Sequence, residues 1–144
     1  MARTRLEFPE LAVFNCQQEL RIADINYGQH LGHDTLVSLL HEARCRWLAT
    51  AGLTELNLDG QQQVGWVVAE LVVNYLAESF YPDCLNLELA IGEQTSRGVE
   101  LLHRVTRSDG KVVALARVGL VFFSYASRRA VTTPERFLQI IEAR

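Results

Sequence analysis

Apolar residues recur every three or four positions between residues 34 and 51, which predicts a long amphipathic helix. The apolar stripe contains Leu36, Leu40, Ala43 and Trp47. At 1.5 Å per residue such a helix is about 27 Å long, so it can lie across several strands spaced about 4.8 Å apart. Gly52 follows the stripe and predicts the C-terminal end of the helix.

Alternation of apolar and polar positions predicts strands on both sides of this helix. A polar connection is expected over residues 53–64, and a short amphipathic helix is expected after Thr133-Pro134. This order predicts an α+β fold in which an antiparallel sheet of about five strands packs against one long helix. The predicted strands cover residues 11–23, 66–76, 85–91, 98–107 and 111–125.

Composition narrows the class of protein. The 144 residues fit one domain, which we take as residues 1–144. The net charge of −3, with both signs interspersed, gives no basic stripe for nucleic acid. Neither a signal-peptide core nor an apolar run of the roughly 20 residues that a membrane span needs is present, so we expect no membrane partner and a cytoplasmic protein.

The three cysteines, Cys16, Cys45 and Cys84, are far apart and form no C-x-x-C pair. We therefore expect free thiols, with Cys45 and Cys84 acting as small buried apolar residues. We expect no cofactor and no metal, because His30 and His33 lie three apart in a loop with no cysteine close by.

A polar cluster directly precedes the long helix and contains Asn26, His30, His33 and Asp34. The first N–H groups of a helix have no intrahelical partner and can stabilise a developing oxyanion, as acyl transfer requires. The four side chains can deliver or activate water at the same place. A polar loop that ends in an ordinary N-cap explains the same pattern, and both interpretations stay open.

Two polar residues interrupt the strand that follows the connection. Alternation places Glu70 and Asn74 on one face of the strand, together with Trp66 and Val68. A carboxylate in an otherwise apolar strand is paired, solvent-facing or functional. All three interpretations remain open for Glu70.

Four motifs occur in an order that resembles the hotdog-fold acyl-CoA thioesterases of the 4-hydroxybenzoyl-CoA thioesterase superfamily. Residues 24–34 (DINYGQHLGHD) are similar to the family's D-x-D pair and helix-opening run, and residues 41–48 (HEARCRWL) contain its Glu-Ala-Arg run. Residues 70–76 and 83–85 fit its Y-x-x-P…G-D-x-L pattern, although the usual proline is absent and Pro82 replaces the glycine. The resemblance covers about residue 14 to 125.

The resemblance implies hydrolysis of an acyl-CoA thioester to a free acid and CoA. In the family the second acid of the D-x-D pair is commonly the catalytic carboxylate, and Asn26 occupies that position here. An amide cannot ionise, so Asn26 can orient water or the thioester carbonyl but cannot act as a base. The base is then one of His30, His33, Asp34 and Glu70, and the sequence does not decide among them.

Hotdog subunits pair edge to edge with their sites at the interface, which implies a homodimer or a tetramer of dimers. Glu70 or Asn74 of one subunit then faces the 24–34 loop of the other, and we expect these two residues and Gly32 to bind substrate. Two alternatives to hydrolysis stay open: a non-catalytic acyl-CoA-binding protein and, less favoured, an acyl-thioester hydratase or dehydratase. The sequence does not identify the acyl group.

Overall fold

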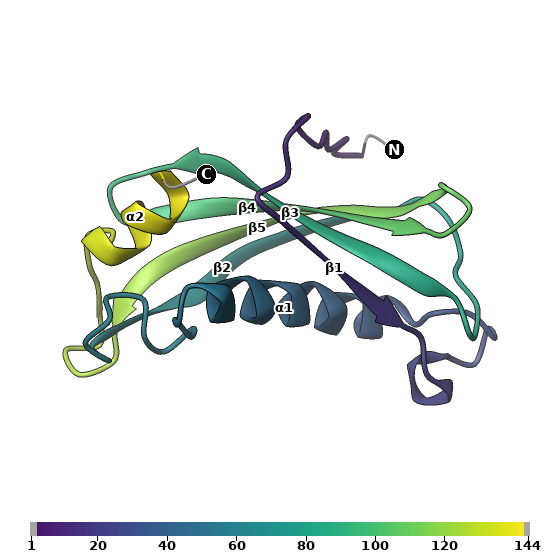
Figure 1. Ribbon diagram of the computed structural model, residues 1–144, viewed down its shortest axis with the longest axis horizontal. Coiled ribbons are helices and arrows are strands. Elements are labelled where there is room, and N and C mark those ends of the chain that lie inside the picture. The colour runs from purple at the N-terminus through teal and green to yellow at the C-terminus, as the bar shows by residue number, and fades with distance from the viewer. Residues whose placement is uncertain (1–2, 143–144) are drawn as a thin grey trace.

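One long helix, α1, lies along one face of an antiparallel sheet in the computed structural model, which describes residues 3–142 (Figure 1). Residues 1, 2, 143 and 144, which the single-domain prediction included, lie outside the described residues. The elements are β1 (Phe14–Glu19), the 3₁₀ turn η1 (Ile22–Asp24), α1 (His33–Thr50), β2 (Val64–Tyr75), β3 (Cys84–Gln94), β4 (Gly98–Arg107), β5 (Val112–Ser124), β6 (Arg129–Ala130) and α2 (Glu135–Glu142).

The sheet has the strand order β1-β3-β4-β5-β2, and the two-residue strand β6 pairs with β5. All of these pairings are antiparallel. The predicted α+β architecture is confirmed, and β6 makes the sheet six-stranded. Strand β2 is an edge of the sheet, where its outer N–H and C=O groups have no neighbouring strand among residues 3–142.

The core lies between α1 and the sheet. Leu36, Leu40, Ala43 and Leu48 of α1 are almost completely buried. They face alternate residues of β3, β4 and β5, because successive side chains of a strand point to opposite faces. Helix α2 closes one end of this core with the fully buried Phe137.

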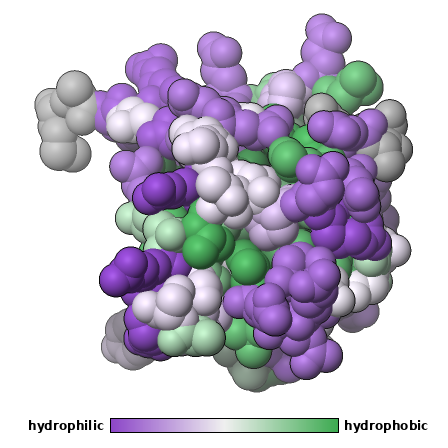
Figure 2. Space-filling model, turned by 90° about the vertical axis from the view of Figure 1, so that its left-hand side faces the viewer, coloured by the Kyte–Doolittle hydropathy of each residue, from purple (hydrophilic) through white to green (hydrophobic). Residues whose placement is uncertain are grey.

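The described chain departs from the predicted elements at β1. Strand β1 is shorter than residues 11–23 because Leu20 N donates to Asp83 O and the chain then turns into η1. The connection at residues 51–63 contains an isolated bridge between Thr54 and Asn57 and no helix. Figure 2 views the end of the molecule where this connection and α2 lie, and hydrophilic side chains surround a few apolar ones there.

The N-terminal segment crosses the face of the sheet away from α1 (Figure 1). The Asn74 amide holds it, since Oδ1 accepts from Leu6 N at 2.9 Å and Nδ2 donates to Thr4 O at 2.7 Å. Further along, the Arg104 guanidinium lies 4.5 Å from the centre of the Phe8 ring. No helix in the described part of the chain has the length and hydropathy needed to span a membrane.

Candidate functional site

The polar cluster of residues 24–34 forms a tight turn before α1. Asn26 N donates to His30 O at 2.9 Å, and Gln29, with φ of 69°, closes the turn by donating to Asn26 O at 2.9 Å. The Asn26 side chain folds back on the same turn, because its Oδ1 accepts from Gly28 N at 3.0 Å and His30 N at 3.4 Å. Its Nδ2 amide takes part in no hydrogen bond among the described residues, so it can donate to a ligand.

The imidazole of His30 is held through Nδ1 and lies near a carboxylate at Nε2. Nδ1 lies 3.0 Å from Leu31 O, and Nε2 lies 3.5 Å from a carboxylate oxygen of Glu78. Since a carbonyl oxygen only accepts, the contact with Leu31 selects the tautomer that carries its proton on Nδ1. Nε2 then presents a lone pair, and a proton that it takes up lies beside the Glu78 carboxylate.

Helix α1 begins at His33, with Gly32 as its N-cap residue. Its first intrahelical hydrogen bond runs from Leu36 N to Gly32 O, so the N–H groups of His33, Asp34 and Thr35 precede that ladder. An ideal Cβ on the buried Gly32 would lie 2.8 Å from Asp34 Oδ1 and 3.5 Å from Asn26 Cβ. Asn26 and Asp34 therefore both lie beside the place that a Cβ of residue 32 would take, and an alanine there would displace the Asp34 carboxylate.

Strand β2 ends beside this helix terminus. The Tyr75 hydroxyl donates to His33 O at 2.9 Å, and the two rings meet edge to face with centroids 6.5 Å apart. Partial burial, and then the negative charge of Asp34, raise the pKa of Tyr75. Tyr75 and Glu78 are site residues that the sequence analysis missed, because only the antiparallel sheet brings their segment to the 24–34 turn.

The structure does not bring Glu70 and Asn74 to this turn within one chain. Glu70 pairs with Arg117 at 3.4 Å, and Arg117 also lies 3.6 Å from Glu100. A bulge between Val68 and Glu70 reverses the alternation of β2. The prediction that Glu70 and Asn74 share a face with Trp66 and Val68 is therefore wrong.

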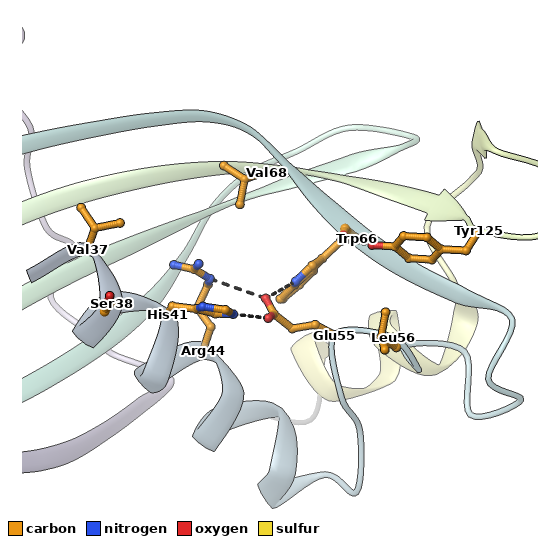
Figure 3. Close-up of a pocket in the computed structure, with 9 residues that line it drawn as sticks. All are labelled: Val37, Ser38, His41, Arg44, Glu55, Leu56, Trp66, Val68 and Tyr125. Carbon is orange, nitrogen blue, oxygen red and sulfur yellow. Dashed lines mark hydrogen bonds and ion pairs between the residues drawn. The ribbon is translucent and has the colours of Figure 1, made fainter. Parts of the chain in front are cut away.

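A second polar cluster surrounds Glu55, beside the middle of α1 (Figure 3). One carboxylate oxygen of Glu55 accepts from His41 Nε2, and the other accepts from the Trp66 indole N–H at 2.6 Å. Partial burial raises the pKa of Glu55, but the hydrogen bonds from Trp66 and His41 outweigh it and keep that pKa below its usual range. The cluster borders a cavity of about 450 Å³, whose lining also includes Val37, Ser38, Arg44, Leu56, Val68 and Tyr125.

Two of the predictions for cysteine are wrong. Cys45 and Cys84 are exposed, although both were expected to be buried. Cys45 Sγ lies 3.6 Å from Glu55 Oε1, and partial burial together with the Glu55 charge raises the pKa of Cys45 to about 11. The apolar stripe of α1 turns away from Cys45, which lies on the same helix face as His41, four residues earlier.

Arg44 connects the Glu55 cluster to His103 in the core. Its guanidinium is almost completely buried, with NH1 3.4 Å from His103 Nε2 and Nε 4.0 Å from Glu55. Burial, and then the Arg44 charge, lower the pKa of His103 to about 3. His103 is therefore a neutral acceptor for Arg44 at neutral pH.

This pKa predicts a pH-dependent stability. The unfolded chain takes up a proton on His103 near pH 6.5, whereas the folded chain does not until about pH 3. Between these values the free energy of unfolding should fall as the pH falls, with a His103 contribution of up to about 1.4 kcal/mol per pH unit. Urea unfolding between pH 7 and 4 gives the free energy of unfolding at each pH. This free energy should fall less steeply with falling pH in His103→Gln than in wild type. An equal pH dependence of the unfolding free energy in the two proteins would contradict a neutral buried His103.

The fold matches that of solved thioesterases. Slr0204, a 1,4-dihydroxy-2-naphthoyl-CoA thioesterase from Synechocystis, is 16% identical with a TM-score of 0.80, over 89% of this chain and 94% of that one. The Staphylococcus aureus protein SAV2348, solved in complex with CoA, is 19% identical with a TM-score of 0.82, over 90% and 82% of the two chains. A DHNA-CoA thioesterase from S. aureus is 16% identical with a TM-score of 0.78, over 90% and 86%.

These matches define the fold as the hotdog fold of thioesterases, and the predicted fold class is confirmed. Residues 20–141 match the Thioesterase-like superfamily, and the chain belongs to that family. No curated protein sequence matches the chain at a significant level. The matched range contains both the 24–34 turn and the Glu55 cluster.

Proposed function

We propose that this protein hydrolyses acyl-CoA thioesters at the 24–34 turn. The observation that carries the proposal is that one short turn holds the Asn26 amide and the His30 imidazole and leads directly into the first N–H groups of α1. Membership of the Thioesterase-like superfamily supports the reaction class, and the CoA bound to SAV2348 supports the form of the substrate.

The helix terminus supplies the electrostatic part of the mechanism. Attack on a thioester places negative charge on the carbonyl oxygen, and the N–H groups at residues 33–35, at the positive end of the helix dipole, can donate to it. Gly32 carries no side chain next to these N–H groups, so no Cβ stands between them and the carbonyl. Asn26 Nδ2 can donate to the same oxygen or to the attacking water.

His30 is the base that the geometry favours. Its Nε2 lone pair takes a proton from water as the water oxygen bonds to the thioester carbon, and the imidazolium then lies 3.5 Å from Glu78. As the carbon–sulfur bond breaks, the imidazolium returns its proton to the CoA sulfur. His33 is engaged with Tyr75 through its carbonyl and its ring, and Asp34 borders the N–H groups, so both contribute to the shape and charge of the site.

The assembly proposal is a homodimer, or a tetramer of dimers, that joins through the β2 edge. Strand β2 exposes three apolar side chains, those of Val68, Leu71 and Tyr75. A second copy that pairs with this edge covers them and continues the sheet. Tyr75 then connects the interface to the 24–34 turn, and Glu70 and Asn74 act across subunits or stay in the contacts they make within one chain.

The reaction is tested by mixing the protein with short, medium, long and aromatic acyl-CoAs and measuring free CoA with a thiol reagent. Hydrolysis releases CoA, and the substrate with the highest kcat/KM identifies the acyl class. A hydratase consumes an enoyl-CoA without releasing CoA. A non-catalytic acyl-CoA-binding protein, which the loss of the family's acid at Asn26 favours, binds the thioester and releases none. Either of the last two results contradicts the proposal.

A further inference from the structure

Three metal-ligating side chains meet on the Glu55 side of α1, outside the site proposed for hydrolysis. Among the described residues, one ligand atom from each of His41, Cys45 and Glu55 lies within 4.8 Å of the others. His41 and Cys45 are four residues apart and so share one face of the helix. Glu55 reaches them from the connection after the helix. Their donors are nitrogen, sulfur and oxygen, the set that Zn²⁺ prefers.

We propose that His41, Cys45 and Glu55 bind a zinc ion, with water as the fourth ligand. The thiolate and the carboxylate together cancel the two positive charges of the ion. Binding replaces the Cys45 S–H bond with a zinc–sulfur bond and releases that proton to solvent. A site with three protein ligands and one water is an open tetrahedral zinc site.

The distances are close to those of a formed site. Tetrahedral bonds of about 2.3 Å to sulfur and about 2.0 Å to oxygen place those two donors about 3.5 Å apart. Cys45 Sγ and Glu55 Oε1 are already 3.6 Å apart. His41 Nε2 touches the same oxygen in a direct hydrogen bond, so the imidazole has to withdraw by about 1 Å for the ion to enter between them. The His41 side chain is 55% exposed and can make that movement.

The carboxylate is oriented in advance by the groups behind it. The Trp66 indole N–H donates to Glu55 Oε2 at 2.6 Å, which leaves Oε1 turned toward His41 (Figure 3). Cys45 Sγ lies 3.6 Å from the same Oε1. Such hydrogen bonds to a ligand's second oxygen typically contribute 10- to 100-fold to metal affinity. Arg44 Nε lies 4.0 Å from the other oxygen, Oε2.

The proposed zinc site lies apart from the proposed hydrolytic site and would have a structural effect. His41 lies eight residues along α1 from His33, about 12 Å along the helix axis. Zinc there would link the last turns of α1 to the connection that leads into β2. The expectation of no metal rested on the loop histidines alone. The pair at positions 41 and 45 has helical spacing, but the third ligand becomes evident only in the fold.

The test is titration of the metal-free full-length protein with Co²⁺, which replaces zinc and reports its ligands by absorption. We expect one Co²⁺ per chain and a near-ultraviolet charge-transfer band from a bound thiolate. Cys45→Ser should abolish the band and weaken binding by more than 100-fold, since it removes a ligand rather than a supporting hydrogen bond. The matched control Cys84→Ser removes another exposed thiol and should leave the charge-transfer band and the Co²⁺ affinity unchanged.

His41→Gln and Glu55→Gln should each weaken Co²⁺ binding more than 100-fold while the circular dichroism spectrum stays that of wild type. Added Zn²⁺ should raise the unfolding temperature of wild type and of Cys84→Ser only. The proposal is overturned if Co²⁺ gives no charge-transfer band, or if the band persists in Cys45→Ser. These readouts are independent of CoA release, so failure here leaves the proposed hydrolysis standing, and the reverse also holds.

Discussion

Replacement of His30 by Gln is expected to lower kcat for CoA release by at least about 100-fold, the lower end of what a general base contributes. Glutamine can still contact Leu31 O through its amide N–H, but it offers no nitrogen lone pair that accepts a proton. The loss corresponds to about 2.7 kcal/mol in the activation free energy. Steady-state thiol release with the best acyl-CoA of the panel measures it.

The matched control for this variant is Tyr27→Phe. Tyr27 lies in the same turn with a fully exposed side chain, so its loss should leave kcat within a few-fold of wild type. Glu78→Gln keeps the His30 base but removes the charge 3.5 Å from its Nε2, so a smaller loss than in His30→Gln is expected. If His30→Gln keeps wild-type kcat while Asp34→Asn or His33→Gln loses 100-fold, the base is not His30.

Truncation of Phe137 to Ala is expected to lower the free energy of unfolding by about 3–5 kcal/mol. The ring is fully buried, and it meets Phe122, Trp66 and Trp47 edge to face at centroid distances of 5.0, 5.6 and 5.9 Å. Its removal leaves a cavity among three large rings that cannot collapse into it. Urea unfolding followed by tryptophan fluorescence measures the change.

The control for Phe137 is Phe80→Ala, because the Phe80 side chain is 46% exposed and its loss should cost far less. Trp66 also donates to Glu55, so Phe137→Ala should loosen the Glu55 cluster more than the 24–34 turn. A loss below about 1 kcal/mol would show that α2 does not dock on the core in solution. In Phe137→Ala, urea unfolding measures stability and CoA release measures hydrolysis, so the two effects are separable.

The elements with a regular period were predictable from the sequence. Helix α1 has a continuous apolar stripe, and Gly52, with φ of 71°, follows it as expected for a helix end. Strand β4 alternates over ten residues, β5 is a nearly continuous apolar run, and the turn formers Asp109-Gly110 lie between them. The N-terminal segment was not predictable, because its hydrogen bonds go to Asn74, about 70 residues away in sequence.

The candidate site was predictable only where its residues are neighbours in sequence. The 24–34 turn and the helix terminus are contiguous, so their meeting follows from local structure. Tyr75 and Glu78 reach the turn through the pairing of β2, and no local pattern marks them. Glu70 was misplaced because a single extra residue in a strand reverses every later side chain, and the bulge has no clear sequence signal.

The central claim is that the 24–34 turn hydrolyses acyl-CoA thioesters, and the most direct measurement compares CoA release by wild type and by Asn26→Ala. Asn26 is exposed and organises the turn through Oδ1, while its Nδ2 is free to donate to substrate or water. We predict that wild type releases CoA and that Asn26→Ala loses most of kcat while its unfolding transition stays close to that of wild type. CoA release that is equal in the two proteins, or absent from wild type for every acyl-CoA, would contradict the claim.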